Sequence, residues 1–301
     1  MPRINHVLPT ALLLAICCLS ADSGAWAQAA RPVSPKVAVW LYRFQDLDTD
    51  EVLTNLQGRS VGRVFLSVPR SLLTAPSDKL LAFISRAHAA GIEVHAMTLE
   101  DPSFVRQENH SKAQGEIDAL LAFCREHPTA SFDGIHLDAE PHVLFQGKGE
   151  RTAGDWAANE ALMKQYLALV EQTSRQVRTS GLQGFSRQPL RLSAAIAWWY
   201  NERAKDGSLP SGSARQLGKS LDFVVPMVYD GIGGSAADVI RRVDDELESV
   251  PTMVGVARKE YPTEEALQSA IGKLNERYGP NPNFQGISIF EYTRWFGVAR
   301  K

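Results

Sequence analysis

The sequence predicts an α/β fold in which eight parallel strands and their helices form a single (β/α)8 TIM barrel. Eight short runs rich in β-branched and apolar residues recur along the chain, at 37–42, 63–68, 92–97, 134–140, 190–199, 222–229, 252–257 and 286–292. Stretches with a helical spacing of apolar residues lie between most of these runs. Parallel strands joined by helices are covered on both faces, and eight such units within about 250 residues match this barrel.

The segments between the strands carry the expected helix signals. Leu80, Ile84 and Ala87 share one face of a predicted helix that ends at Gly91. Ser235 is expected to cap a later helix, because a serine side chain accepts a hydrogen bond from the first helical turn. Strand and helix therefore alternate along the chain.

A doubly wound sheet is the alternative fold. Such sheets usually contain fewer strands, and many carry a glycine-rich loop after the first strand, whereas residues 39–51 contain no glycine. Polar stretches at 141–157 and 200–216 each follow a predicted strand, so we expect them to be long loops at the C-terminal mouth of the barrel. No linker divides the chain.

The first residues have the features of an export signal. An apolar run at 7–19 follows Arg3, and Ala25-Trp26-Ala27 is a small-x-small cleavage site. We therefore expect a periplasmic or secreted protein with a signal peptide at 1–27 and a catalytic barrel domain at 28–301. The apolar run is too short to span a bilayer stably.

The chain has three cysteines, and two of them lie in the predicted signal peptide. A lipid anchor at Cys17 or Cys18 is the weaker alternative to cleavage, because Ile16 stands where a small residue is expected. After cleavage Cys124 is the only cysteine, so no internal disulfide forms, and we expect it to be a small buried hydrophobic residue.

Composition limits the kind of partner. The chain has 301 residues, of which 44% are hydrophobic and 22% charged, with a formal net charge of −2. The sequence has no basic tract that would indicate binding to nucleic acid. It has no second apolar span that would indicate an integral membrane protein after the signal is removed. We expect a monomer with a neutral or weakly charged partner.

The run 132–142, FDGIHLDAEPH, carries polar side chains on one face of a predicted strand. Because side chains alternate along a strand, His136, Asp138 and Glu140 point into the barrel. Two neighbouring carboxyl groups do not both ionise easily, so the pKa of one is raised and a proton stays available for acid catalysis. We expect Glu140 to hold it beside an ionised Asp138, with His136 neutral and bonded to Asp138.

The same side chains are suitable metal ligands. However, three ligands from a single strand are spread over too great a length to share one ion. Metal-dependent barrel hydrolases usually draw their ligands from several strands. We therefore expect no metal.

With these residues, the sequence resembles glycoside hydrolase family 18, the chitinase-like barrels. The strand-four signature of that family is D-x-x-D-x-D-x-E, which Asp133, Asp138 and Glu140 match, while His136 replaces the second aspartate. The strand-six signature, Met-x-Tyr-Asp, matches 227–230, two predicted strands later. The family's Ser-x-Gly-Gly on strand three is missing.

The resemblance implies a glycosidase that acts on glycans containing N-acetylated hexosamine without metal or cofactor. Glu140 would protonate the leaving oxygen as the general acid. Asp138 would orient the 2-acetamido group of the substrate while its carbonyl oxygen attacks the anomeric carbon, which makes the hydrolysis substrate-assisted and retaining. Tyr229 would hydrogen-bond the reacting group, and Met227 and Asp230 of the same motif would bind the sugar.

Aromatic side chains stand near the ends of several predicted strands, where flat rings can stack on sugar faces. We expect substrate contacts from Tyr42, from Trp295 and from at least one of Trp198 and Trp199. His142 and His136 are also expected to line the substrate site.

Two other functions stay open. The Ala-Glu-Pro at 139–141 resembles the Asn-Glu-Pro of a large clan of retaining glycosidases, in which a second glutamate is the nucleophile. Glu291 is the nearest candidate for that nucleophile. A carbohydrate-binding barrel without catalysis is the other alternative, because His136 stands in place of the family aspartate.

Overall fold

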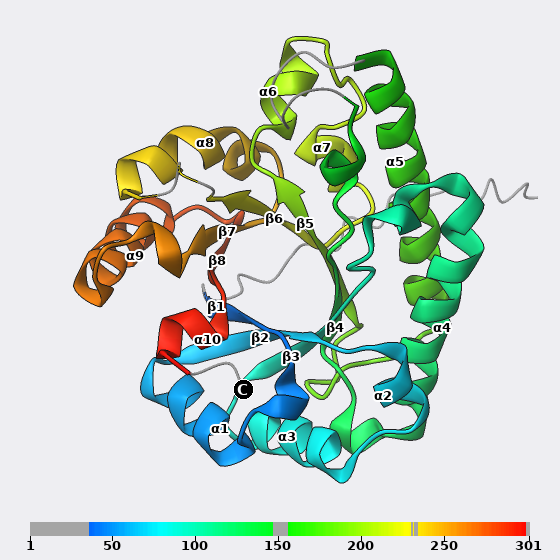
Figure 1. The fold of residues 1–301 in the computed structure, drawn as a ribbon, viewed down its shortest axis with the longest axis vertical. Coiled ribbons are helices and arrows are strands. Elements are labelled where there is room, and N and C mark those ends of the chain that lie inside the picture. Colours follow the sequence, from blue (N-terminus) through cyan, green and yellow to red (C-terminus); the bar gives the residue numbers. More distant parts are fainter. Residues whose placement is uncertain (1–35, 147–155, 230, 232–233, 299–301) are drawn as a thin grey trace, which may run out of the picture. The chain divides into compact units, whose positions relative to one another are not determined.

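Eight parallel strands form a closed barrel in sequence order, and the last strand pairs with the first (Figure 1). This computed structural model describes residues 36–146, 156–229, 231 and 234–298, which belong to one unit spanning 34–301. The predicted signal peptide at 1–27 lies outside the described residues. Each strand is parallel to both neighbours, so the predicted (β/α)8 barrel is confirmed.

The strands coincide with the predicted runs, although several end earlier than expected, β4 by three residues and β5 and β8 by two. They are β1 Lys36–Leu41, β2 Val61–Ser67, β3 Glu93–Thr98, β4 Gly134–Leu137, β5 Arg191–Ala197, β6 Phe223–Val228, β7 Thr252–Ala257 and β8 Phe284–Phe290. Strand β4 ends at Leu137, shortly before Pro141, which has no amide hydrogen for a ladder bond. Strand β5 ends before Trp198 because the chain turns there into a helix.

Helices cover the outside of the barrel (Figure 1). They are α1 Thr49–Gly58, α2 Arg70–Thr74, α3 Asp78–Ala89, α4 His110–Glu126, α5 Trp156–Thr179, α6 Tyr200–Lys205, α7 Ala214–Leu217, α8 Ala236–Ser249, α9 Glu264–Tyr278 and α10 Tyr292–Phe296. Leu80, Ile84 and Ala87 are buried on one face of α3, as their spacing predicts. The cap is confirmed too, since the Ser235 side chain accepts a hydrogen bond from the Asp238 amide.

Several strand-to-helix connections contain short 3-10 helices. They are η1 Phe44–Asp46, η2 Pro102–Val105, η3 Gln107–Asn109, η4 Pro128–Ala130, η5 Pro141–Leu144 and η6 Arg258–Glu260. The predicted loop at 200–216 contains α6 and α7, and the predicted loop at 141–157 begins with η5. Residues 147–155 of that loop lie outside the described residues.

The barrel has two apolar layers. The larger one lies between the strands and the helices, and the smaller one fills the barrel with Ala38, Trp40, Phe65, Met97, Phe223, Val225 and Met253. The Trp40 ring requires a glycine opposite it. A Cβ on Gly255 would lie 3.2 Å from that ring and 2.8 Å from the Pro226 carbonyl oxygen. The interior is therefore packed with side chains, as in other barrels of this type.

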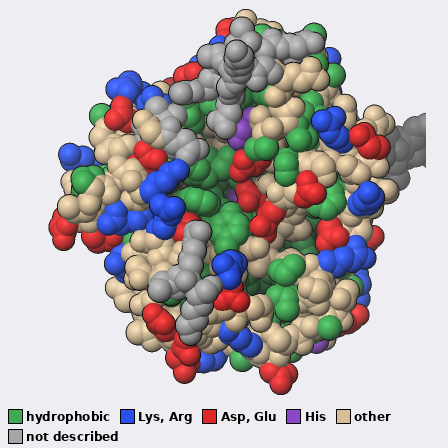
Figure 2. All heavy atoms as spheres, in the orientation of Figure 1, with side chains coloured by type: hydrophobic (Ala, Val, Ile, Leu, Met, Phe, Trp, Pro, Cys, Tyr) green, Lys and Arg blue, Asp and Glu red, His purple; other side chains and the backbone are tan. Residues whose placement is uncertain are grey.

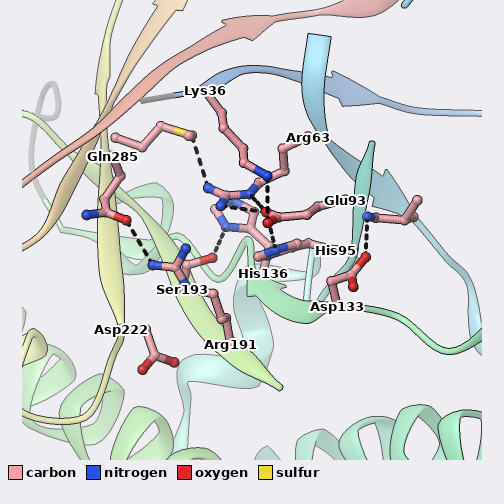
Figure 3. Close-up of polar contacts among 12 residues, drawn as sticks. Lys36, Arg63, Glu93, His95, Asp133, His136, Arg191, Ser193, Asp222 and Gln285 are labelled. Atoms are coloured by element: carbon pink, nitrogen blue, oxygen red, sulfur yellow. Dashed lines mark hydrogen bonds and ion pairs between the residues drawn. The ribbon is translucent and has the colours of Figure 1, made fainter. Parts of the chain in front are cut away.

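Charged side chains close the barrel at the N-terminal ends of the strands (Figure 3). The fully buried Arg63 donates to Oε2 of Glu93 from Nε at 2.9 Å and from Nη2 at 2.7 Å. Lys36 donates to the other oxygen of Glu93 at 2.7 Å. The guanidinium groups of Arg63 and Arg191 lie 4.9 and 4.6 Å from the centroid of the Phe223 ring. Pairing and ring contacts offset the cost of burying these charges, so this end is a closed floor.

Three features of the described residues bear on partners. No described helix combines the length and the apolar character needed to cross a bilayer. No three His, Cys, Asp or Glu side chains of the described residues gather closely enough to hold a metal ion. Cys124 is buried as predicted, and this burial raises the pKa of its thiol.

One buried carboxyl group lies far from the rim of the barrel. Glu246 on α8 is 1% exposed, and neither of its oxygens has a hydrogen-bond partner among the described residues. Burial raises the pKa of Glu246 to about 8. The folded protein therefore keeps a proton on Glu246 at pH values where the unfolded chain, with a pKa of 4.5, has lost it.

We predict that Glu246→Gln stabilises the protein at pH 8 and removes part of its pH dependence. The wild type is expected to lose free energy of unfolding as the pH rises from 4.5 to about 8, by up to about 5 kcal/mol at about 1.4 kcal/mol per unit. Urea unfolding at several pH values measures this loss. The exposed neighbour Glu248 provides the control, and an equal pH dependence in Glu246→Gln and Glu248→Gln would contradict the prediction.

Candidate active site

The C-terminal ends of several strands bring predicted side chains to one rim. Tyr42 follows β1, and its hydroxyl donates to Oδ2 of Asp138 at 3.1 Å. The ring of Tyr229, after β6, stacks on Phe290 with 5.3 Å between centroids. Phe290 ends β8 and also contacts the ring of Tyr42 at 6.0 Å. Asp138, Tyr42 and Tyr229 are therefore joined, through Phe290, by contacts at the ends of four strands, β1, β4, β6 and β8.

Asp138 is the carboxyl group of this rim whose pKa is raised most by its surroundings. Burial raises the pKa of Asp138 to about 7, and the nearby charges of Glu140 and Glu100 add to the rise. The hydrogen bond from Tyr42 acts in the opposite direction. Burial and the charge of Asp138 in turn raise the pKa of Tyr42, so its hydroxyl stays a donor. The expected fully ionised Asp138 is thus replaced by one that is about half protonated at pH 7.

Glu140 lies just beyond the end of β4, as the residue that precedes η5. Its side chain is 29% exposed, and its Oε2 lies 3.2 Å from Nε2 of His142. The other ring nitrogen of His142 lies 3.0 Å from the hydroxyl of Tyr200, the first residue of α6. Both carboxyl groups of the rim are therefore half-buried, and one of them contacts a histidine, so protons can be given and taken beside a bound molecule.

His136 does not make the expected bond to Asp138. Its Nδ1 lies 2.9 Å from Oγ of Ser193, on the neighbouring strand β5 (Figure 3). The ring stacks on Phe65 at 4.1 Å and is fully buried. Burial, with the charges of His95 and Arg63, lowers the pKa of His136 well below its usual value. His136 is therefore a neutral histidine of the barrel interior and is not exposed at the rim.

The predicted tryptophans lie beside or outside the rim. Trp199 packs its ring edge against His142 and is 2% exposed. Trp198 faces the guanidinium of Arg242 on α8, at 4.8 Å from the ring centroid. The indole nitrogen of Trp295 donates to Glu264 on α9 at 3.0 Å. We therefore keep only Trp199 near the site, as a support for His142.

The other predicted residues divide in the same way. Met227 is a buried residue of β6, two positions before Tyr229, and thus points to the same side. Glu291 is 3% exposed, and its Oε1 accepts a hydrogen bond from the Thr293 hydroxyl at 2.7 Å. Asp230, expected to bind the sugar, lies outside the described residues.

Two further polar groups lie close to the carboxyl groups, and sequence reasoning missed the first of them. Tyr166 on α5 is fully buried, its hydroxyl has no hydrogen-bond partner among the described residues, and the charges of Asp138 and Glu140 help burial to raise its pKa. Glu100 follows β3 and accepts a hydrogen bond from Ser67, while the neighbouring Asp101 caps η2. The charge of Glu100 acts on Asp138.

A cavity of about 420 Å³ adjoins this rim beyond the ends of β1, β2 and β3. Apolar side chains, among them Phe44, Leu72 and Phe104, form much of its wall, and Glu100 and Arg70 also line it. Figure 2 shows acidic and hydrophobic side chains next to each other around the centre of the barrel. Mixed apolar and polar walls of this kind are typical of small-molecule sites.

Solved structures of similar fold are chitinase-like barrels. The chain matches a chitinase from Chromobacterium violaceum with a TM-score of 0.54 and 12% identity, over 89% of this chain and 100% of the other. A glycoside hydrolase family 18 chitinase from Pseudoalteromonas aurantia gives 0.58 and 11%, over 86% and 94%. A spore cortex-lytic enzyme from Bacillus megaterium gives 0.54 and 12%, over 90% and 74%.

No family model matches the sequence, and no curated protein matches it. At these identities the structures show the fold, which is the chitinase-like barrel that the motifs of β4 and β6 predict. The roles of the rim residues follow from their geometry.

We predict opposite pKa changes at Asp138 from two substitutions. Tyr42→Phe removes a donor to the carboxylate, so the pKa of Asp138 rises above about 7, whereas Glu100→Gln removes a nearby negative charge, so this pKa falls. Carbon-13 spectra of the aspartate carboxyl carbons across pH 4 to 10 measure both changes, with Asp138→Asn to assign the signal. Shifts of the same sign in the two variants would contradict this account of the rim.

Proposed function

We propose that this chitinase-like barrel is a glycoside hydrolase that cleaves glycans containing N-acetylated hexosamine. The observation that carries the proposal is the pair of half-buried carboxyl groups at the end of β4, where Asp138 accepts a hydrogen bond from Tyr42 and has a raised pKa, while Glu140 beside it contacts His142. Two neighbouring carboxyl groups with different surroundings divide the tasks of holding the substrate and moving its proton.

In the first step, the acetamido carbonyl oxygen of the substrate attacks the anomeric carbon while the bond to the leaving oxygen breaks. Glu140, as the general acid, gives its proton to that leaving oxygen. Asp138, in its carboxylate form, accepts a hydrogen bond from the acetamido N–H and balances the positive charge that develops on the ring formed. The two residues come from one strand end, so a nucleophile on the opposite face has to come from the substrate itself.

In the second step, water attacks the anomeric carbon and the bond to the acetamido oxygen breaks. The Glu140 carboxylate takes a proton from this water and returns to its acid form, so the enzyme ends the cycle unchanged. Both attacks reverse the configuration at the anomeric carbon, and the product therefore retains it.

Aromatic side chains complete the proposed sugar site. The stacked rings of Tyr229 and Phe290 form an apolar floor for the sugar that reacts, and the Tyr229 hydroxyl is the donor that we assign to the acetamido group. Met227 and Asp230 flank that tyrosine in the sequence. The cavity near Glu100 offers space for further sugar units. The proteins of similar fold include chitinases and a cortex-lytic enzyme, which supports a glycan substrate.

A carboxylate nucleophile is less compatible with the geometry. Glu291, the candidate for the Asn-Glu-Pro clan, is almost fully buried and accepts a hydrogen bond from Thr293. A barrel that binds glycans without cleaving them is favoured by one observation: His136, at the position where the family has an acid, bonds Ser193 instead of Asp138. The experiment below separates these possibilities.

The location of the protein is also a proposal. We propose export with cleavage before Gln28, which rests on the sequence of residues 1–27 alone. The monomeric state stays a prediction in the same way.

We predict that Glu140→Gln lowers the turnover of an aryl N-acetylglucosamine oligomer by about 10²- to 10⁴-fold, because it removes the general acid. Asp138→Asn is expected to lower turnover strongly as well, and only for substrates that carry the acetamido group. Fluorescence of the released aryl alcohol and a screen of acetylated against deacetylated polymers measure these effects. Glu276→Gln, an exposed acid on α9, is the control.

Unchanged turnover in Glu140→Gln would remove Glu140 from the mechanism. Equal cleavage of deacetylated glycans, or a covalent sugar adduct with a fluorinated substrate, would exclude participation of the acetamido group. Glycan binding by the wild type without any hydrolysis would identify the protein as a binding barrel.

A further inference from the structure

His142 connects Glu140 with Tyr200 through its two ring nitrogens. Nε2 lies 3.2 Å from Oε2 of Glu140, and Nδ1 lies 3.0 Å from the Tyr200 hydroxyl. The ring of His142 is 8% exposed and Tyr200 is 1% exposed, so both are held inside the protein. Trp199 contacts both rings edge-on, at 6.0 and 5.0 Å between centroids. These contacts hold the His142 imidazole in a fixed orientation. The Glu140 carboxyl group has no comparable support of its own.

We propose that His142 is a positioning residue for Glu140, held in turn by Tyr200. The hydrogen-bonded chain fixes one oxygen of the Glu140 carboxyl group and leaves the other to exchange its proton with the substrate. This inference rests on the proposed function, because it explains how the general acid is aimed. In this proposal His142 orients the general acid Glu140, instead of contacting the sugar as the sequence predicts.

The need for such a residue follows from the place of Glu140 in the chain. Glu140 comes after the last residue of β4, so no strand ladder holds its backbone. Its other carboxyl oxygen, Oε1, has no hydrogen-bond partner among the described residues. A misplacement of about 1 Å in a reacting group can cost about 10²-fold in rate, so fixing one oxygen preserves the geometry for proton transfer.

The chain of hydrogen bonds accommodates both forms of Glu140. A tyrosine hydroxyl ordinarily keeps its proton at neutral pH, and when it donates to Nδ1, the hydrogen of the neutral imidazole is on Nε2, which donates to the carboxylate. When Glu140 gains a proton, the proton is on Oε1, which faces the substrate, while Nε2–H still donates to Oε2 and the Tyr200 hydroxyl still donates to Nδ1. The imidazole therefore keeps one tautomer through the cycle. The two forms differ by one proton, as the acid and base steps require.

The groups that face this pair determine how the test is interpreted. Tyr200 on α6 faces His142. Asp138, at the end of β4, and Tyr166, on α5, interact electrostatically with Glu140. None of these groups is a cation. Among the described residues, His142 is the group whose N–H contacts the Glu140 carboxylate.

The test compares His142→Leu, which removes both ring nitrogens, with His142→Gln, which keeps an N–H donor near the carboxylate. We expect His142→Leu to lower kcat by about 10- to 100-fold with KM changed by less than about 3-fold, and His142→Gln to recover most of this loss. Tyr200→Phe should change kcat in the same direction and by less. His127→Leu, a half-buried histidine at the end of α4, is the control.

A merely structural role would lower the melting temperature and change kcat and KM together, and that result would overturn the proposal. So would a His142→Gln variant as slow as His142→Leu. Nitrogen-15 spectra of the imidazole rings give a readout that needs no turnover, with His142→Gln to assign the signal. The His142 nitrogens should shift in Glu140→Gln if the contact exists in solution, and an unchanged signal would overturn the proposal even if Glu140 proves essential. If Glu140→Gln stays active while the signal shifts, the contact is real and the proposed function is the part that fails.

Discussion

The burial of the Asp138 carboxyl group beside a second carboxyl group is the constraint on which the candidate site depends. Burial and the charges of Glu140 and Glu100 favour the protonated form, while the Tyr42 hydroxyl favours the carboxylate. Because these influences oppose each other, the pKa of Asp138 lies near neutral pH, and a bound molecule can change the protonation of the group. The rest of the rim can be understood as the set of contacts that keeps this balance.

Closure of the barrel makes that balance possible. Tyr42 and Asp138 are separated by 96 positions in the sequence, and they meet because β1 and β4 end at the same rim. Trp40, Phe65 and the neutral His136, which precedes Asp138 by two positions, pack their rings together inside the barrel. His136 thus contributes to the low polarity around Asp138 although it makes no hydrogen bond with it. The substitution of the family aspartate by histidine exchanges an acidic neighbour for a packed ring.

Most of the fold could be predicted from the sequence, because strand runs and helix faces are local patterns. The positions of all eight strands and the Ser235 cap agree with prediction for this reason. The ends of β4 and β5 were predicted less well, since the apolar residues Trp198 and Trp199 extend the pattern while the backbone already turns. The pairing of His142 with Tyr200, 58 positions away, was not predictable, because contacts between two loops leave no periodic signal. The same is true of Tyr166, which reads as one more apolar position of a long helix.

The paired charges at the lower end of the barrel also determine from which side a ligand can reach the protein. With Arg63, Glu93 and Phe223 closing that end and large rings filling the middle, there is no tunnel along the barrel axis among the described residues. A molecule that binds at the rim must therefore arrive and leave through the same opening, at the C-terminal ends of the strands.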